Sequence, residues 1–70
     1  MKTTGKEGDI RNVIPGQRVR LIKMPNDPRP IMPGETGTVA SVDDIGTIHV
    51  NWDSGRLLGL VPGEDLYEII

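Results

Sequence analysis

The chain has 70 residues, enough for one small domain with a thin hydrophobic core. Its 8 Lys and Arg residues are balanced by 10 Asp and Glu residues, and a net charge of −2 is not the strongly basic character typical of tight phosphate binding. The absence of Cys excludes disulfides and thiolate metal sites and fits a reducing compartment. Trp52 and Tyr67 are the only aromatic residues, too few for a base-stacking surface or a methyl-lysine cage.

The beginning of the chain is polar, and residues 1–9 are predicted to form a flexible tail before a single domain over residues 10–70. These first residues lack the apolar core of a signal peptide. The apolar runs of the chain are also far too short to span a membrane. We therefore expect a soluble, cytoplasmic protein.

Short runs rich in Val, Ile, Leu and Thr alternate with the 9 Gly and 6 Pro residues, which predicts strands joined by turns. No stretch keeps a helical period for ten residues. The predicted strands are residues 17–24, 36–42, 47–52, 56–61 and 66–69. The stretch 25–33 contains four prolines and predicts a stiff loop, because proline cannot donate to a strand ladder. Residues 62–65 predict a 3₁₀ turn before the last strand.

This order of elements predicts an all-β fold, a small SH3-like five-stranded antiparallel barrel. Closing the sheet would remove most of the exposed edge that short strands present. The alternative is an open antiparallel sheet that completes itself by dimerising. Alternation in the third strand places His49 on the outer face and its two neighbours in the core. The predicted core comprises Val19, Leu21, Val39, Ile48, Val50, Leu58, Leu60, Tyr67 and Ile69.

Four segments of the sequence, PGQRVRLIKM, PGETGTV, VDDIGTIHVNWDSGR and PGEDLYEII, resemble a family of small bacterial and phage domains of unknown function. The resemblance covers residues 15–70. It implies an SH3-like barrel and brings no established activity. Leu57 and Leu66 stand where this family pattern leads us to expect polar residues, so both are candidates for a contact particular to this protein. The residues that match the pattern, none with an imported role, are Asp43, Asp44, Gly46, His49, Trp52, Asp53, Gly55 and Arg56.

Catalytic, cofactor and metal sites are not expected. A general base needs a nucleophile within reach, and the single histidine, His49, has neither a Cys nor a well-placed Ser beside it. The run NWDSG resembles the start of a calcium loop, but its glycine comes one position early and no glutamate follows at the required spacing. Asp43, Asp44 and Asp53 are therefore interpreted as turn residues that bond their own backbone.

Partner-binding candidates come from the loop, the third strand and the residues that follow it. Ile31 and Met32 are an apolar pair that either folds back on the core or meets a partner. Trp52 is interpreted first as a core residue and alternatively as a binding anchor on which Arg56 could stack. The candidate partner-binding residues are Arg29, Ile31, Met32, His49, Trp52, Arg56, Leu57 and Leu66.

A non-catalytic module for protein–protein interaction is the leading functional prediction, with either an unidentified protein or a second copy of the chain as partner. Nucleic-acid binding is the alternative, with phosphates contacted through Arg18, Arg20 and Lys23 on the first strand. A phage or mobile-element accessory protein that inhibits a host enzyme is a further alternative. The sequence identifies no specific partner.

Overall fold

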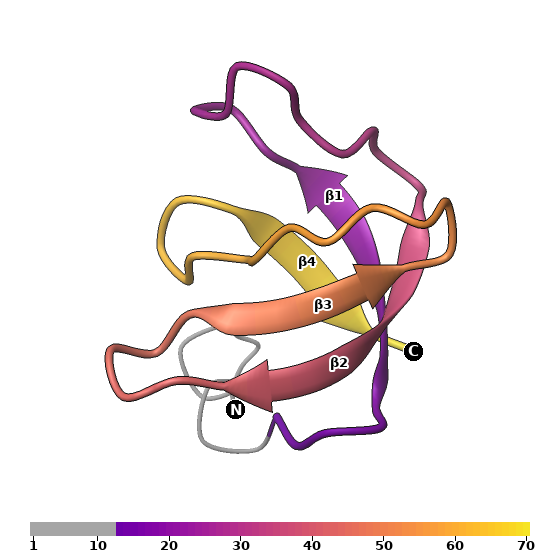
Figure 1. Cartoon of the computed structure of the whole chain (residues 1–70). Coiled ribbons are helices and arrows are strands. Elements are labelled where there is room, and N and C mark those ends of the chain that lie inside the picture. Colours follow the sequence, from indigo (N-terminus) through magenta and orange to yellow (C-terminus); the bar gives the residue numbers. More distant parts are fainter. Residues whose placement is uncertain (1–12) are drawn as a thin grey trace.

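The computed structural model describes residues 13–70, so the predicted tail and residues 10–12 of the predicted domain lie outside the described residues. Four antiparallel strands form one twisted sheet in the order β3-β2-β1-β4 (Figure 1). No helix is assigned among the described residues, and accordingly no helix there could cross a membrane. The all-β prediction is confirmed. The strands are β1 (Arg18–Lys23), β2 (Thr36–Val42), β3 (Ile48–Trp52) and β4 (Leu66–Ile69).

The segment 56–61, predicted as the fourth of five strands, follows β3 without becoming a strand. Isolated bridges pair Ile48 with Leu60 and Asn51 with Leu57, and both pairs fit one antiparallel register. Between the two bridges no strand is assigned to the segment. The described sheet therefore has four strands and is not closed, and the predicted five-stranded barrel is not observed.

A tryptophan hydrogen bond gives the physical reason for this difference. The register of the two bridges places Val50 opposite Leu58, where an antiparallel ladder would exchange backbone hydrogen bonds. The carbonyl of Leu58 instead accepts the indole Nε1–H of Trp52 at 2.8 Å. Among the backbone hydrogen bonds of residues 13–70, none is donated by Val50 to Leu58. One side chain thus replaces a bond of the ladder, a competition that strand propensities do not reveal.

The predicted turn before the last strand is present as a single hydrogen-bonded turn. The Val61 carbonyl accepts the N–H of Glu64 at 3.0 Å and the N–H of Asp65 at 2.9 Å. The buried Asp65 carboxylate accepts the N–H of Val61 in return, also at 2.9 Å. These bonds reverse the chain between the flank of β3 and the start of β4.

The core covers one face of the sheet. In β3 the side chains alternate between buried and exposed, with His49 and Asn51 outward, which confirms the predicted register of this strand. Leu58 packs against the core while partly exposed. The predicted burial of Ile69 is wrong, since this residue, on the edge strand β4, is 37% exposed. The buried apolar residues are Val13, Val19, Leu21, Met24, Ile31, Val39, Ile48, Val50, Trp52, Leu60 and Tyr67.

The proline-rich loop 25–33 is folded back on the domain. Ile31 is buried in the core, and its N–H donates to the Met24 sulfur at 3.4 Å. Arg56 lies 27 and 26 positions further along the chain than Arg29 and Pro30, and its guanidinium donates to their carbonyls at 2.6 and 3.2 Å, respectively. The loop is therefore fixed at its centre as well as at its ends.

Strands β2 and β3 approach so closely that one position requires glycine. A Cβ on Gly37 would lie 2.7 Å from Cγ1 of Val50, 2.9 Å from the carbonyl oxygen of Asn51 and 3.0 Å from Cα of Trp52. Contacts this short with backbone atoms cannot be relieved by a rotamer change. Gly37 thus sets the spacing between β2 and β3.

Candidate functional site

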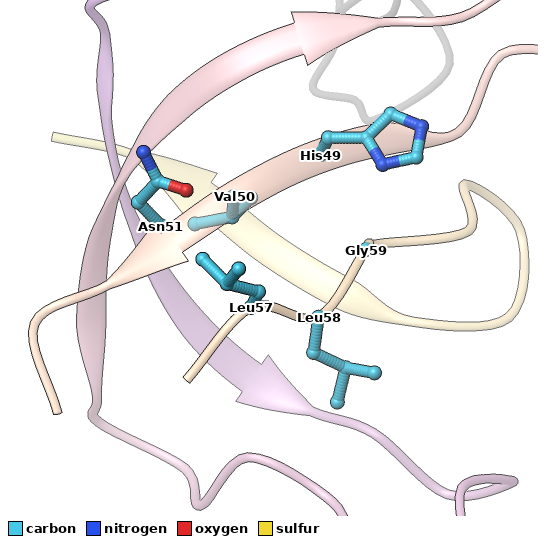
Figure 2. Close-up of a pocket in the computed structure, with 6 residues that line it drawn as sticks. All are labelled: His49, Val50, Asn51, Leu57, Leu58 and Gly59. Atoms are coloured by element: carbon cyan, nitrogen blue, oxygen red, sulfur yellow. The ribbon is translucent and has the colours of Figure 1, made fainter. Parts of the chain in front are cut away.

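A groove of about 220 Å³ lies between β3 and the segment that follows it (Figure 2). It coincides with the interrupted part of the ladder, between the two isolated bridges. Figure 2 shows Leu57 pointing toward Val50 and Asn51, while Leu58 points the other way. The residues that line the groove are His49, Val50, Asn51, Leu57, Leu58 and Gly59.

A glycine keeps the outer side of this groove open. Gly59 lies opposite His49 in the register that joins the two bridges, so no side chain projects there from the facing segment. A Cβ on Gly59 would lie 2.7 Å from Cγ2 of Thr47 and 4.0 Å from Nδ1 of His49. A glycine within a strand-like segment often marks close backbone approach, and here it leaves room beside the imidazole.

The rim of the groove combines a large apolar side chain with polar groups. Leu57 is 77% exposed, and Asn51 is its bridge partner on β3. A single exposed leucine is common on protein surfaces and by itself indicates nothing. Its place at a groove, beside an amide and an imidazole on a regular strand, makes it a combined apolar and hydrogen-bonding surface.

A hydrogen bond to Asp43 fixes the imidazole of His49. The Nε2 atom of His49 lies 2.9 Å from Oδ2 of Asp43, and Oδ1 accepts the backbone N–H groups of Ile45 and Thr47. The hydrogen bond from His49, together with these backbone bonds, holds the pKa of Asp43 below its ordinary value. With a hydrogen on Nε2, the neutral imidazole presents Nδ1 as an acceptor toward Gly59.

Among residues 13–70, Asp43 is the side chain that is hydrogen-bonded to the His49 imidazole. Ser41 lies opposite His49 in the β2–β3 register, yet within residues 13–70 no hydrogen bond joins its hydroxyl to the imidazole. A histidine–aspartate pair acts as a general base only on a nucleophile or water within reach. No group of three or more His, Asp or Glu side chains suited to a metal ion occurs in the part of the chain described.

Carboxylates pair with two of the three residues predicted to contact phosphates, Arg18 and Arg20. The guanidinium of Arg18 bonds both carboxylate oxygens of Asp53, at 2.7 and 2.6 Å, and Thr36 donates to the same carboxylate at 2.6 Å. These bonds, that of Arg18 first, hold the pKa of Asp53 well below its ordinary range. Arg20 pairs with Glu68 at 2.8 Å. The interpretation of Asp53 as a residue that bonds its own turn is therefore wrong, although Asp43 does so.

Several other predicted site residues do not line the groove. Ile31 and Trp52 are buried, so the core interpretation holds for both. Arg56 is engaged with the loop carbonyls. The remaining candidates are exposed but scattered: Arg29 and Met32 on the loop, Lys23 at the end of β1 and Leu66 on β4.

Only His49 and Leu57, of the predicted candidates, come together at the groove. Sequence reasoning missed Asn51 and Gly59. The alternation of β3 already placed Asn51 beside His49, and an isolated glycine in a predicted strand is a recognised sign of close approach or a bulge. Either signal could have directed attention to this edge of β3.

Comparison with known sequences identifies the family of the chain. The family described as Domain of unknown function (DUF4314) matches residues 8–70. The chain belongs to this family. No curated protein and no solved structure gives a significant match. The expected membership in a domain family of unknown function is thus confirmed, and the groove must be interpreted from its own geometry.

Proposed function

We propose that the protein is a non-catalytic protein-binding module with an SH3-like barrel plan, in which the segment 56–60 takes the place of the fourth strand. The sheet order, extended by the two bridges between this segment and β3, supports the plan. A single turn before the last strand and a long loop after the first fit the same plan. The groove between β3 and the segment is the proposed binding surface.

The position of Leu57 carries this proposal. An apolar side chain that is 77% exposed projects at a groove whose other rim groups, the imidazole of His49 and the amide of Asn51, are able to form hydrogen bonds. Protein-binding surfaces combine an apolar contact with directional polar groups held on a rigid element. The β3 strand supplies that rigidity, because β2 pairs with it along its length.

The charge distribution favours a protein over a nucleic acid as partner. Arg18 and Arg20 are paired with Asp53 and Glu68 on the surface of the sheet. A phosphate would have to displace these carboxylates, and the chain as a whole is acidic. The predicted phosphate contact would therefore rest on Lys23, with little support from its neighbours.

A capture experiment tests the proposal with matched variants. Wild-type protein, Leu57→Asp and Ile45→Asp are immobilised and exposed to cell lysate under identical conditions. Ile45 is 87% exposed on the turn between β2 and β3, outside the groove, so its substitution introduces the same charge at a different place. Both positions are exposed, and neither substitution removes a core contact.

We expect the same protein to be retained by the wild type and by Ile45→Asp and to be lost with Leu57→Asp. Retention of the same protein by the wild type and both variants would overturn the proposal that the groove is the binding surface. The proposal would also be overturned if none of the three immobilised proteins retained a partner. Light scattering of the purified protein shows whether the retained partner is a second copy of the chain. A dimer that Leu57→Asp dissociates would identify self-association as the function of the same surface.

A further inference from the structure

We infer that the groove binds the carboxamide side chain of an Asn or Gln residue presented by a partner protein. The inference rests on the proposed function and specifies the chemical group that is recognised. A primary carboxamide offers one acceptor oxygen and an adjacent N–H donor on a small planar group. The groove offers the complementary pair, one donor in its floor and one acceptor in its wall.

The donor is the backbone N–H of Val50. This residue is 2% exposed, and it lines the groove at the point where the ladder is interrupted. Its expected acceptor, the carbonyl of Leu58, is bonded to the indole of Trp52. A buried N–H without an acceptor costs free energy, so an oxygen that enters the groove gains the bond that the ladder does not provide.

The acceptor is Nδ1 of His49. Because Asp43 accepts from Nε2, the hydrogen of the neutral ring is fixed there, and Nδ1 remains on the side of Gly59. The carboxamide N–H would donate to this nitrogen. A carboxylate has no hydrogen to donate, and the Asp43 carboxylate nearby would repel it. The groove should therefore distinguish Gln from Glu.

The bonds at both ends of the groove restrict what can enter. At one end Ile48 and Leu60 exchange backbone hydrogen bonds of 2.9 and 2.7 Å. At the other end the backbone N–H of Trp52 donates to the Arg56 carbonyl at 2.9 Å. An extended peptide cannot run between β3 and the segment 57–59 while these bonds remain. The tip of a side chain can enter from the outer face, and its carbon stem would then lie on the exposed Leu57 at the rim.

Three short peptides separate the side chain from the backbone in a direct test. The probes are Ala-Gln-Ala, Ala-Glu-Ala and Ala-Met-Ala with acetyl and N-methylamide ends, so that only the Gln side chain carries a primary carboxamide; they share the same backbone amides and differ in one side chain of similar length. Each is titrated into labelled protein while amide spectra are recorded by NMR. The protein variants are the wild type, His49→Phe, which removes the proposed acceptor, and Ile45→Ala as a control outside the groove.

We expect the Gln peptide to shift the amide proton of Val50 downfield with saturation, and to bind about tenfold more tightly than either other peptide, as one or more lost hydrogen bonds would give. His49→Phe should weaken the Gln peptide by a similar factor, and Ile45→Ala should not. Equal binding of the three peptides, or no shift at Val50, would overturn the inference. If that happens while capture still depends on Leu57, the proposed function stands and only the carboxamide specificity fails.

Discussion

The two flanks of the sheet use the same kind of strand pairing with different results. On one side β4 pairs with β1 through a ladder that spans Val19 to Lys23, with a single irregularity. On the other side the segment 56–60 keeps one register with β3, but only its ends are bonded. At its centre the Leu58 carbonyl accepts the indole N–H of Trp52, and within the described residues no backbone hydrogen bond from Val50 reaches it.

The comparison separates two properties that usually occur together. A segment can bury its side chains in strand register without completing the strand hydrogen bonds, and the incomplete bonds then create a groove. Leu60 is as fully buried as the core residues of β1. The following substitutions test this separation, from the largest expected effect to the smallest.

Leu60→Ala should destabilise the protein as strongly as Leu21→Ala, by about 2–5 kcal/mol each, because both remove a fully buried leucine. Chemical denaturation of the two variants measures the loss. The result would show that the interrupted flank contributes as much packing energy as the regular one. A loss for Leu60→Ala well under half of that for Leu21→Ala would contradict the comparison.

Gly37→Ala should destabilise the protein by roughly 1–3 kcal/mol, because its Cβ would press on backbone atoms of β3. Gly59→Ala should destabilise the protein less, because the atom nearest to its added Cβ is Cγ2 of the Thr47 side chain rather than a backbone atom. Thermal unfolding of both variants gives the order directly. If Gly59→Ala proved the more damaging, the segment 57–59 would be held against β3 more rigidly than its open ladder implies.

Trp52→Phe removes the indole N–H while keeping an aromatic ring in the core. A lost hydrogen bond costs about 1 kcal/mol, but the Leu58 carbonyl is released for the N–H of Val50. Hydrogen exchange at Val50 should therefore slow relative to that of Val39, whose N–H donates to Gln17 in both proteins. Faster exchange at Val50 would mean that the tryptophan does not keep the ladder open.

Asp53→Asn should have the smallest effect, visible mainly in acid. The pKa of Asp53 is lowered in the folded state, so its stabilising contribution is present above its ordinary pKa and is lost as the pH falls toward the folded value. Wild-type stability should therefore fall on acidification more steeply than that of Asp53→Asn. Circular dichroism between neutral and acidic pH measures the difference, and parallel curves would contradict the assignment.

Local pattern was sufficient to predict most of the fold. Strict alternation located β3 and its buried face, and the bounds of β2 and β4 agree with the predicted ranges. The fate of 56–61 could not be predicted, because the competing donor comes from a side chain on the neighbouring strand. Likewise, an edge position decides the exposure of Ile69, and edges are a property of the whole sheet.

The candidate site was predicted only in part for a similar reason. His49 and Leu57 were recognised as candidates, but their meeting across the groove depends on the register between two segments. For Ile31 the sequence left two alternatives open, folding back on the core or contact with a partner, and the structure buries it. Its burial and the bonds of Arg56 to the loop are long-range facts that a local pattern does not contain.

The bonds from Arg56 to the loop also bear on the order of events in folding. The donor and its acceptors, the carbonyls of Arg29 and Pro30, are separated by 27 and 26 positions along the chain. Contacts at such separation form only after the intervening chain has been closed into a loop, which carries an entropic cost. We therefore expect the proline-rich stretch to become ordered after the hairpin that carries Arg56, at a late stage of folding.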